Sequence, residues 1–558
     1  MDSRSLWPHY AALACALSLL VPACSDDGGN TENTETSDTS GDGDGDPTGD
    51  GDGDPATGDG DGDPTGDGDG DPTGDGDGDP TGDGDGDPTG DGDGDPLAST
   101  RLVVVGQTDS LDLLSAANNY LGGPLDGFIA SIELDGRGSS IEFAEYVGGN
   151  DYEQLRDVAL DANGRACVAG RMASTNLATT DDALQSSYGG GGMDSFLICW
   201  DEAGATLYSS YFGGDNYDVG YGLSIDEDGG IVMSGRTSSS NLPTTPGAFQ
   251  TDYAGGQQNQ QPYFGGDYFV FRFSPGGDSI VWGSFIGGSN DDAGRGRNAI
   301  ANDGAIWVGG RTQSQNFPVT MGSLQGQSDG GVARLSADGS TLEMGTFIGG
   351  SDPLDAATGG LVALDDGSAI VCGYTNSADF PAPNNAAQPD PGGGFDGAVY
   401  HLAADGTVLA ASYLGGSNYE ECQGVDVDSE GNVYVIGLTN SPDFPFTSGS
   451  LSGPSDMYLA KLNPEMTSFE YAIPVGGSGE ETADASRVWV TQDGRAVLTA
   501  ATTSDDLPFT LDAVQAERGG GQDVMLAIVS ADGTGFDYLS YFGGSGDDFP
   551  RAIAVLEQ

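Results

Sequence analysis

Basic residues are scarce in this chain. Only 17 of its 558 residues are Lys or Arg, with Lys461 the single lysine, whereas 88 are Asp or Glu, so the formal net charge is −71 at pH 7. Binding to nucleic acid requires a cationic face that displaces counterions from phosphates, so this composition excludes nucleic acid as a partner. It argues equally against electrostatic docking on anionic lipid.

Histidine is scarcer still, with only His9 and His401 in the whole chain. If the N-terminus is removed on export, His401 alone remains, so no histidine-based triad or metal cluster can be built beyond one member. We expect His401 to be an ordinary strand residue. The sequence leaves the enzyme question open and favours a non-catalytic role, and it indicates no cofactor apart from the Ca²⁺ considered below.

Long hydrophobic runs are also missing. The apolar stretch Ala11–Ala23 is too short for a bilayer span, which needs about 20 residues, and residues 1–24 are typical of an export signal. Its end, Leu20–Cys24, resembles a bacterial lipobox, which implies a lipid on Cys24; ordinary secretion with cleavage nearby is the alternative. Ser25 after the cysteine favours the outer membrane. We therefore expect an exported protein held to the outer membrane by acyl chains, facing the periplasm or the cell surface.

Residues 25–98 contain nothing apolar enough to bury in a core. Residues 25–96 hold 26 acidic residues and no basic one, and residues 41–96 are seven near-identical Gly-Asp-Pro units. Such a segment cannot offset the entropy of ordering, so we expect an extended, disordered acidic spacer. Diffuse Ca²⁺ association is the alternative, but an EF-hand loop also needs a distal glutamate that these units lack.

The rest of the chain, residues 99–558, is rich in an internal repeat. An aromatic or apolar pair followed by Gly-Gly recurs seven times, at intervals of 61 to 74 residues. Repeats of this length decide the fold of a chain. The first glycines of the seven pairs are Gly148, Gly213, Gly287, Gly349, Gly415, Gly476 and Gly543.

Each repeat unit is predicted to form four short strands. In the fifth unit, Gln423–Asp428 and Val433–Gly437 alternate apolar and polar residues around a Ser-Glu-Gly-Asn turn, which is hairpin chemistry. The sequence predicts an all-β fold, a seven-bladed β-propeller of four-stranded blades. One C-terminal strand, Ala552–Leu556, and three N-terminal strands would together form one blade and close the ring. The three N-terminal strands are expected at Leu102–Thr108, Gly127–Asp135 and Ile141–Val147.

The segment Tyr413–Pro445 resembles the SBBP-type bacterial β-propeller repeat. The resemblance rests on Tyr-Leu-Gly-Gly-Ser, on Val-Asp-Val-Asp-Ser-Glu-Gly-Asn-Val-Tyr-Val-Ile-Gly-Leu-Thr-Asn-Ser and on Asp-Phe-Pro. It implies a propeller in an exported bacterial protein. The family carries no catalytic motif, so the resemblance implies no activity.

Long loops between the second and third strands would gather on one face of the propeller, together with the crossovers between blades. The longest is Ser238–Gly266, and Asn376–Gly394 is rich in Pro and Asn. Because a rigid scaffold commonly presents function on its loops, we expect any ligand on this long-loop face; a functionally silent surface is the alternative. A protein or glycan partner would bind there, and we expect a monomer.

One acidic residue follows each Gly-Gly by a few positions. Seven-fold repetition would place these carboxylates in a ring near the channel mouth, where they could attract a cation such as Ca²⁺. The alternative is that each carboxylate caps its own turn by accepting backbone N–H bonds. The seven residues are Glu153, Asp218, Asp292, Asp355, Glu420, Glu481 and Asp548.

Four cysteines lie in the repeat region, and export makes disulfides feasible. Cys167 and Cys199 fall on adjacent predicted strands of one blade, so a bridge between them is predicted. Cys372 and Cys422 fall in different blades, where pairing is less expected and buried thiols are the alternative. No paired Cys-x-x-Cys spacing supports a zinc site.

Together these features predict a lipid-anchored, envelope- or surface-displayed propeller that acts as a binding or scaffold module through its long-loop face. The alternative is an exported polysaccharide hydrolase or lyase that uses channel-mouth carboxylates. One or two carboxylates with strongly raised pKa values would favour the enzyme, whereas uniformly hydrogen-bonded carboxylates would favour the binder.

Overall fold

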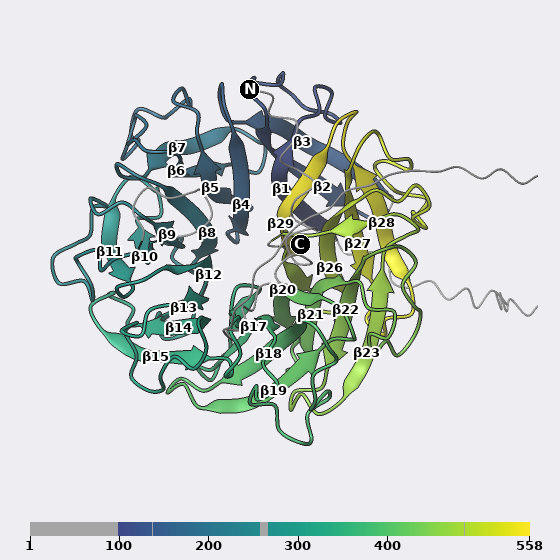
Figure 1. Cartoon of the computed structure of the whole chain (residues 1–558). Helices are drawn as coiled ribbons and strands as arrows, with labels where there is room; N and C mark the ends of the chain where they lie inside the picture. The colour runs from purple at the N-terminus through teal and green to yellow at the C-terminus, as the bar shows by residue number, and fades with distance from the viewer. Residues whose placement is uncertain (1–98, 137, 257–265, 485, 558) are drawn as a thin grey trace, which may run out of the picture. The chain divides into compact units, whose positions relative to one another are not determined.

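The computed structural model describes residues 99–136, 138–256, 266–484 and 486–557. The export signal, Cys24 and the acidic spacer therefore lie outside the described residues. Seven antiparallel sheets are arranged around a common axis, with the first strand of each sheet nearest to it (Figure 1). This confirms the predicted seven-bladed propeller. Within the described residues no helix is long and apolar enough to cross a membrane.

Blade 1 joins the two ends of the repeat region. Its strand order is β29-β1-β2-β3, and β1 pairs with β29 from Thr100↔Glu557 to Thr108↔Asp548. One C-terminal and three N-terminal strands thus close the ring, as the sequence predicted. The strands are β1 (Thr100–Thr108), β2 (Asp126–Leu134), β3 (Ser139–Val147) and β29 (Asp548–Glu557).

Blades 2, 3, 4 and 6 each contain four consecutive strands in chain order. The turn between their first and second strands ends in a glycine that takes a left-handed conformation, as at Gly164 (φ 76°). Blade 2 has β4 (Glu153–Leu160), β5 (Ala166–Met172), β6 (Asp194–Trp200) and β7 (Thr206–Phe212). Blade 3 has β8 (Asp218–Ile225), β9 (Ile231–Thr237), β10 (Asp267–Phe273) and β11 (Ile280–Ile286). Blade 4 has β12 (Asp292–Ile300), β13 (Ile306–Thr312), β14 (Asp329–Leu335) and β15 (Leu342–Ile348). Blade 6 has β20 (Glu420–Val427), β21 (Val433–Thr439), β22 (Asp456–Leu462) and β23 (Phe469–Val475).

Blades 5 and 7 have interrupted first strands. In blade 5 the first strand keeps only three residues, and in blade 7 it is divided into two pieces that both pair with β26. Blade 5 has β16 (Leu361–Ala363), β17 (Ala369–Thr375), β18 (Asp396–Leu402) and β19 (Val408–Leu414). Blade 7 has β24 (Glu481–Thr482), β25 (Val488–Val490), β26 (Ala496–Thr502), β27 (Asp523–Val529) and β28 (Phe536–Phe542).

The hydrophobic core lies between the blades. Seven clusters of buried residues occur, and each combines apolar side chains from two neighbouring blades. Between blades 2 and 3, for example, the ring of Phe212 packs edge-on against that of Phe271, with centroids 4.7 Å apart. Because every blade packs against a neighbour on both sides, ring closure leaves no apolar blade face exposed at either end of the repeat.

Two disulfides connect the four cysteines of the propeller. Cys167 and Cys199 are directly opposite each other on β5 and β6 and are bonded. Cys372 and Cys422 are also bonded, so the weaker expectation for this pair was wrong. The physical reason is that Cys422 on β20 faces β17 of the neighbouring blade, and the bridge therefore joins blades 5 and 6.

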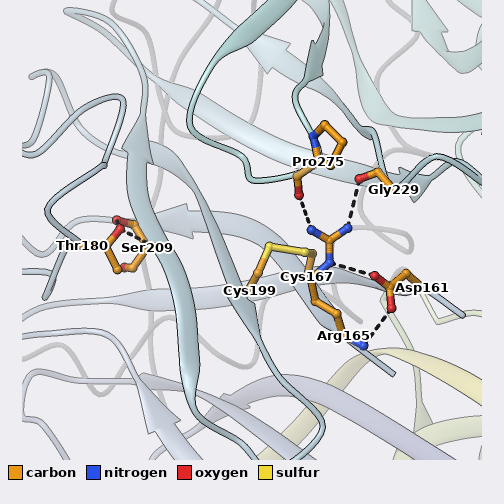
Figure 2. The surroundings of a disulfide bond; sticks show 8 residues. All are labelled: Asp161, Arg165, Cys167, Thr180, Cys199, Ser209, Gly229 and Pro275. Atoms are coloured by element: carbon orange, nitrogen blue, oxygen red, sulfur yellow. Dashed lines mark hydrogen bonds and ion pairs between the residues drawn. A yellow bond between two sulfur atoms is a disulfide. The ribbon is translucent and has the colours of Figure 1, made fainter. Parts of the chain in front are cut away.

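Blades 2 and 3 are tied by an arginine close to the first disulfide (Figure 2). The Arg165 guanidinium donates to the carbonyl oxygens of Gly229 (3.0 Å) and Pro275 in blade 3, and its Nε lies 3.0 Å from Asp161 Oδ2. The tie fixes the blades on the face opposite the long loops.

Candidate functional site

The seven acids predicted to form a ring occupy equivalent, fully buried positions at or just before the start of each first strand. Asp218 shows the shared contacts. Its Oδ2 accepts hydrogen bonds from Gly214 N (2.7 Å) and Ser239 Oγ (2.8 Å), and its Oδ1 accepts one from Thr237. The second glycine of each Gly-Gly donates to the acid in this way in all seven blades.

These carboxylates are not brought together at the channel mouth. Each accepts hydrogen bonds from its own turn. In the described ranges no group of three or more His, Cys, Asp or Glu side chains is placed to hold a metal ion. Burial raises their pKa values throughout the set, for example to about 8 for Glu153, about 7 for Glu481 and about 6 for Asp292. The contacts are those of the turn-capping alternative.

A second set of seven buried aspartates was not predicted from the sequence. Each begins a third strand and accepts backbone N–H bonds from the loop before it, as Asp194 does from Gly189. The N–H of the first-strand acid of the next blade bonds to the carbonyl preceding this aspartate, as Asp218 does to Met193 O (2.8 Å). The seven are Asp126, Asp194, Asp267, Asp329, Asp396, Asp456 and Asp523.

The first glycine of each Gly-Gly lies against these carboxyl groups. A methyl group at Gly543 would be 2.7 Å from Asp523 Cγ and 2.7 Å from Asp548 Oδ2. Only a residue without a side chain fits between the two carboxyls, which explains the recurring Gly-Gly.

Replacing Gly415 by alanine is expected to lower the free energy of unfolding by about 2 kcal/mol, because the new methyl group would lie 1.9 Å from Asp396 Oδ1. Denaturant unfolding monitored by tryptophan fluorescence measures the change. Gly535→Ala is the matched control, since nothing lies within 4 Å of that position. Equal stability of the two variants would contradict the close packing at Gly415.

Each complete first strand carries a β-bulge near its start. In blade 2, Leu155 pairs with Gly170 and Asp157 with Ala169, so Arg156 is the extra residue. A bulge turns a side chain away from the normal alternation. The bulge also brings a carbonyl close to a glycine on the second strand, because a methyl group at Gly235 would lie 1.9 Å from Val219 O.

The bulge position is always three residues after the first-strand acid. In blades 5 and 7 the same position falls in the interrupted part of the first strand. We call these seven residues the bulge ring; it consists of Arg156, Tyr221, Arg295, Thr358, Gln423, Asp484 and Arg551.

Side chains of the bulge ring meet across the axis. Asp484 Oδ2 lies 3.0 Å from Arg156 Nη1 and also contacts Arg551, while its Oδ1 lies 2.7 Å from Arg295 Nη2. Burial would raise the pKa of Asp484, but these three guanidiniums outweigh it and hold the pKa well below its usual range. Arg295 also donates to Gln423 (2.7 Å).

A second carboxylate, Asp157, is fully buried and directly follows the bulge-ring residue Arg156 on β4. It accepts from Leu223 N (2.7 Å), from Arg297 Nη1 (3.2 Å) and from Arg487. These residues come from blades 2, 3, 4 and 7, so one carboxylate joins four blades at the axis.

Three more arginines lie toward the long-loop face. Arg171, Arg236 and Arg311 occupy one equivalent position, near the ends of the second strands of three consecutive blades. Arg171 donates to the hydroxyls of Tyr152 (3.2 Å) and Tyr217, and the Arg236 guanidinium lies 5.1 Å from the Tyr217 ring centroid. These guanidiniums all come from blades 2, 3 and 4, so the positive charge at this position is confined to one side of the ring.

The axial arginine cluster is the set of eight guanidiniums described above. They are nearly half of the 17 basic residues of the chain, and the carboxylates among them are Asp157, Glu421 and Asp484. The axis of this acidic protein is therefore cationic. The cluster consists of Arg156, Arg171, Arg236, Arg295, Arg297, Arg311, Arg487 and Arg551.

Tyr221 lies inside this cluster, with the Arg156 guanidinium 5.3 Å from its ring centroid. Burial raises the pKa of the Tyr221 phenol, but Arg236, Arg156 and Arg171 outweigh burial and lower the pKa to about 8. A phenol in such surroundings ionises more readily than an ordinary tyrosine.

The remaining candidates lie elsewhere. His401 on β18 contacts Ser368 Oγ (2.8 Å), and Lys461 on β22 pairs with Asp428 (3.1 Å); both are strand residues away from the axis. The long loop after β9 lies partly outside the described residues. The fixed three-residue offset from each acid marks the positions of the bulge ring, but it does not reveal the arginine cluster, because those positions carry different residue types.

One family match agrees with the fold. Residues 411–445 match the SBBP beta-propeller repeat. The regulatory protein FlaEY of Caulobacter vibrioides is 24% identical over 435 residues, which are 72% of this chain and 43% of FlaEY. The chain thus spans less than half the length of this curated relative.

Solved structures of low identity are also similar. An apocarotenoid oxygenase variant of Synechocystis has a TM-score of 0.41 and 11% identity, covering 83% of this chain and 93% of that one. A protein of unknown function from Dyadobacter fermentans has a TM-score of 0.36 and 14% identity, with 68% and 94% covered. BamB of Moraxella catarrhalis has a TM-score of 0.29 and 12% identity, with 71% and 96% covered.

Proposed function

We propose that this propeller is a binding module whose ligand is an acidic saccharide, held at the long-loop end of the axis by the axial arginine cluster. The observation that carries the proposal is the position of Arg171, Arg236 and Arg311. Three consecutive blades place a guanidinium at one equivalent position in a domain that is otherwise acidic. A guanidinium binds a carboxylate through two parallel hydrogen bonds, which suits a uronic acid.

Aromatic rings support a saccharide over other anions. Tyr152, Tyr217 and Tyr374 lie beside these guanidiniums, and each presents both a flat apolar face and a hydroxyl. Such amphipathic rings suit sugars, whose ring faces are apolar and whose edges carry hydroxyls. The acidic exterior opposes long polyanions, so we expect a chain end or a short oligosaccharide to enter at the axis.

The uniformity of the first-strand acids supports binding rather than hydrolysis. Their pKa values are raised throughout the set by the same cause, burial, and each carboxylate is used by its own turn. A hydrolase needs an acid and a base whose environments separate their pKa values. An exported lyase is the second candidate, and Tyr221 favours it, because its phenol with a pKa of about 8 lies among guanidiniums that could hold a uronate.

The proposed address rests on the sequence alone. A lipid on Cys24 would hold the module at the outer membrane, with the acidic spacer setting its distance from the bilayer. A monomer suffices for this role, because the ring is closed by its own strands.

Replacing Arg236 by glutamine is expected to weaken binding of an oligogalacturonate at least tenfold, because a charge-assisted hydrogen bond contributes about 1.5 to 3 kcal/mol. Isothermal titration calorimetry on the full chain measures the dissociation constant. Arg518→Gln is the matched control on the same face, since Arg518 pairs with the exposed Asp505 in a loop of blade 7.

Three outcomes distinguish the candidates. Binding that is lost with Arg236 but kept with Arg518 supports the module, and formation of an unsaturated uronate product in the same mixtures supports the lyase. Equal affinity of both variants, tight binding of a neutral oligosaccharide, or preference for an acidic peptide contradicts the proposal.

A further inference from the structure

Two buried carboxyl groups are close neighbours at every junction between blades. One begins a third strand and the other is the first-strand acid of the next blade, and both are 0 to 1% exposed. Backbone bonding holds them together, because in all seven junctions the N–H of the first-strand acid bonds to the carbonyl just before the third-strand aspartate. At one junction the carboxyls of Asp456 and Glu481 both lie against Gly476, where a methyl group would be 2.2 Å from Glu481 Oε2 and 3.1 Å from Asp456 Oδ1.

An independent observation is that many of these pairs contain a carboxylate oxygen without a hydrogen-bond partner among the described residues. Five third-strand aspartates carry a buried Oδ1 that has no hydrogen-bond partner among the described residues. A buried ionised oxygen without a partner is costly, and two ionised carboxylates at close range repel each other as well. The five are Asp126, Asp194, Asp267, Asp396 and Asp523.

We propose that each of these seven carboxyl pairs is a proton-binding site, in which one proton is shared between the third-strand aspartate and the first-strand acid near neutral pH. The proton removes one negative charge from each junction and converts repulsion between the carboxyls into a hydrogen bond. The pair then titrates as one unit rather than as two independent groups. The shared protons consequently stabilise the contacts between neighbouring blades at the long-loop end of the propeller.

The junction of blades 2 and 3 shows the surroundings of such a pair. Burial is the main cause that raises the pKa of Asp194 to about 7 and that of Asp218 to about 6. The other titratable groups near the pair are an acid and three phenols: Asp215 beside Asp218, Tyr188 beside both carboxyls, Tyr211 beside Asp194 and Tyr253 beside Asp218.

The sign of the pH dependence follows from these shifts. A carboxyl with a raised pKa binds its proton more tightly when folded, so unfolding releases protons between the ordinary pKa near 4 and the raised values. Stability is therefore greatest at the acid end of this window. It falls as the pH rises through about 6 to 8, by up to a tenfold change in the unfolding constant per pH unit for each proton.

The test compares unfolding of the full chain between pH 5 and pH 8 in the wild type and in Asp194→Asn, whose neutral amide imitates the protonated carboxyl. The wild type is expected to lose stability as the pH rises. The Asp194→Asn variant should lose less, by up to tenfold in the unfolding constant per pH unit. Asp182→Asn, at an exposed aspartate elsewhere in blade 2, should keep the slope of the wild type.

Two further measurements keep the proposal falsifiable if Asp194→Asn does not fold. Calorimetric unfolding of the wild type at pH 6 in buffers of different ionisation enthalpy should show proton release, and proton uptake or none would overturn the proposal. Stabilisation by Ca²⁺ at pH 8 that a chelator reverses would also overturn it, because the pairs would then hold a cation. Identical pH slopes for a folded Asp194→Asn and the wild type would do the same.

Discussion

Replacement of Asp157 by alanine is expected to lower the free energy of unfolding by about 3 to 5 kcal/mol, the cost of breaking a buried ion pair from one side. Asp157 is fully buried and accepts hydrogen bonds from Arg297, Arg487 and the backbone of Leu223. Removing it takes the carboxylate away from two guanidiniums at the axis. Because these partners come from blades 3, 4 and 7, the loss should loosen several blades at once.

Urea unfolding monitored by tryptophan fluorescence measures this change. Asp157→Asn is the informative second variant, since its amide oxygen can still accept from Leu223 N while its charge is gone, and an intermediate loss is expected. Asp182→Ala, an exposed aspartate of blade 2, is the control and should change stability by less than about 0.5 kcal/mol. A loss below about 1 kcal/mol in Asp157→Ala would show that the axial ion pairs do not hold the blades.

Loss of the Cys372–Cys422 disulfide is expected to cost about 4 kcal/mol, because the bridge closes a loop with a sequence separation of 50 residues. This bridge links β17 of blade 5 to β20 of blade 6, beside the first strand that keeps only three residues. The covalent link therefore compensates for the backbone pairing that blade 5 lacks near the axis.

Thermal unfolding of Cys372→Ala/Cys422→Ala against the wild type, both without reductant, measures the effect. Cys167→Ala/Cys199→Ala is the comparison, with a separation of 32 residues within one blade and a slightly smaller expected loss. Reduction of the wild type should reproduce the combined loss of the two bridges. Free thiols at Cys167, Cys199, Cys372 and Cys422 in the unreduced, denatured protein would contradict both disulfides.

The architecture could be predicted because it depends on signals that repeat. Gly-Gly pairs, period-two strands and short turns that end in glycine recur along the chain, and the ends of the region supply complementary strands, so ring closure followed from counting strands. The position of Cys167 opposite Cys199 followed from strand adjacency within one blade. Cys372 and Cys422 could not be paired in this way, because their contact depends on how two blades pack.

The axial cluster could not be predicted from the repeat, because equivalent positions carry different residues. Arg156, Tyr221 and Thr358 share one place in the repeat and no chemistry, so no pattern connects them in the sequence. The bulge that turns them toward the axis is a backbone feature, visible only as a glycine on the neighbouring strand. Only one member of each carboxyl pair could be predicted. The first-strand acids follow the Gly-Gly pairs at a short distance, whereas no motif marks partners such as Asp194.

A crystal structure of the full chain with a bound galacturonate oligosaccharide tests the central claim most directly. We predict a sugar carboxylate within hydrogen-bond distance of the Arg171, Arg236 or Arg311 guanidinium, at the long-loop end of the axis. A sugar bound only to outer loops or to the opposite face, with these three guanidiniums contacting protein groups alone, would contradict it.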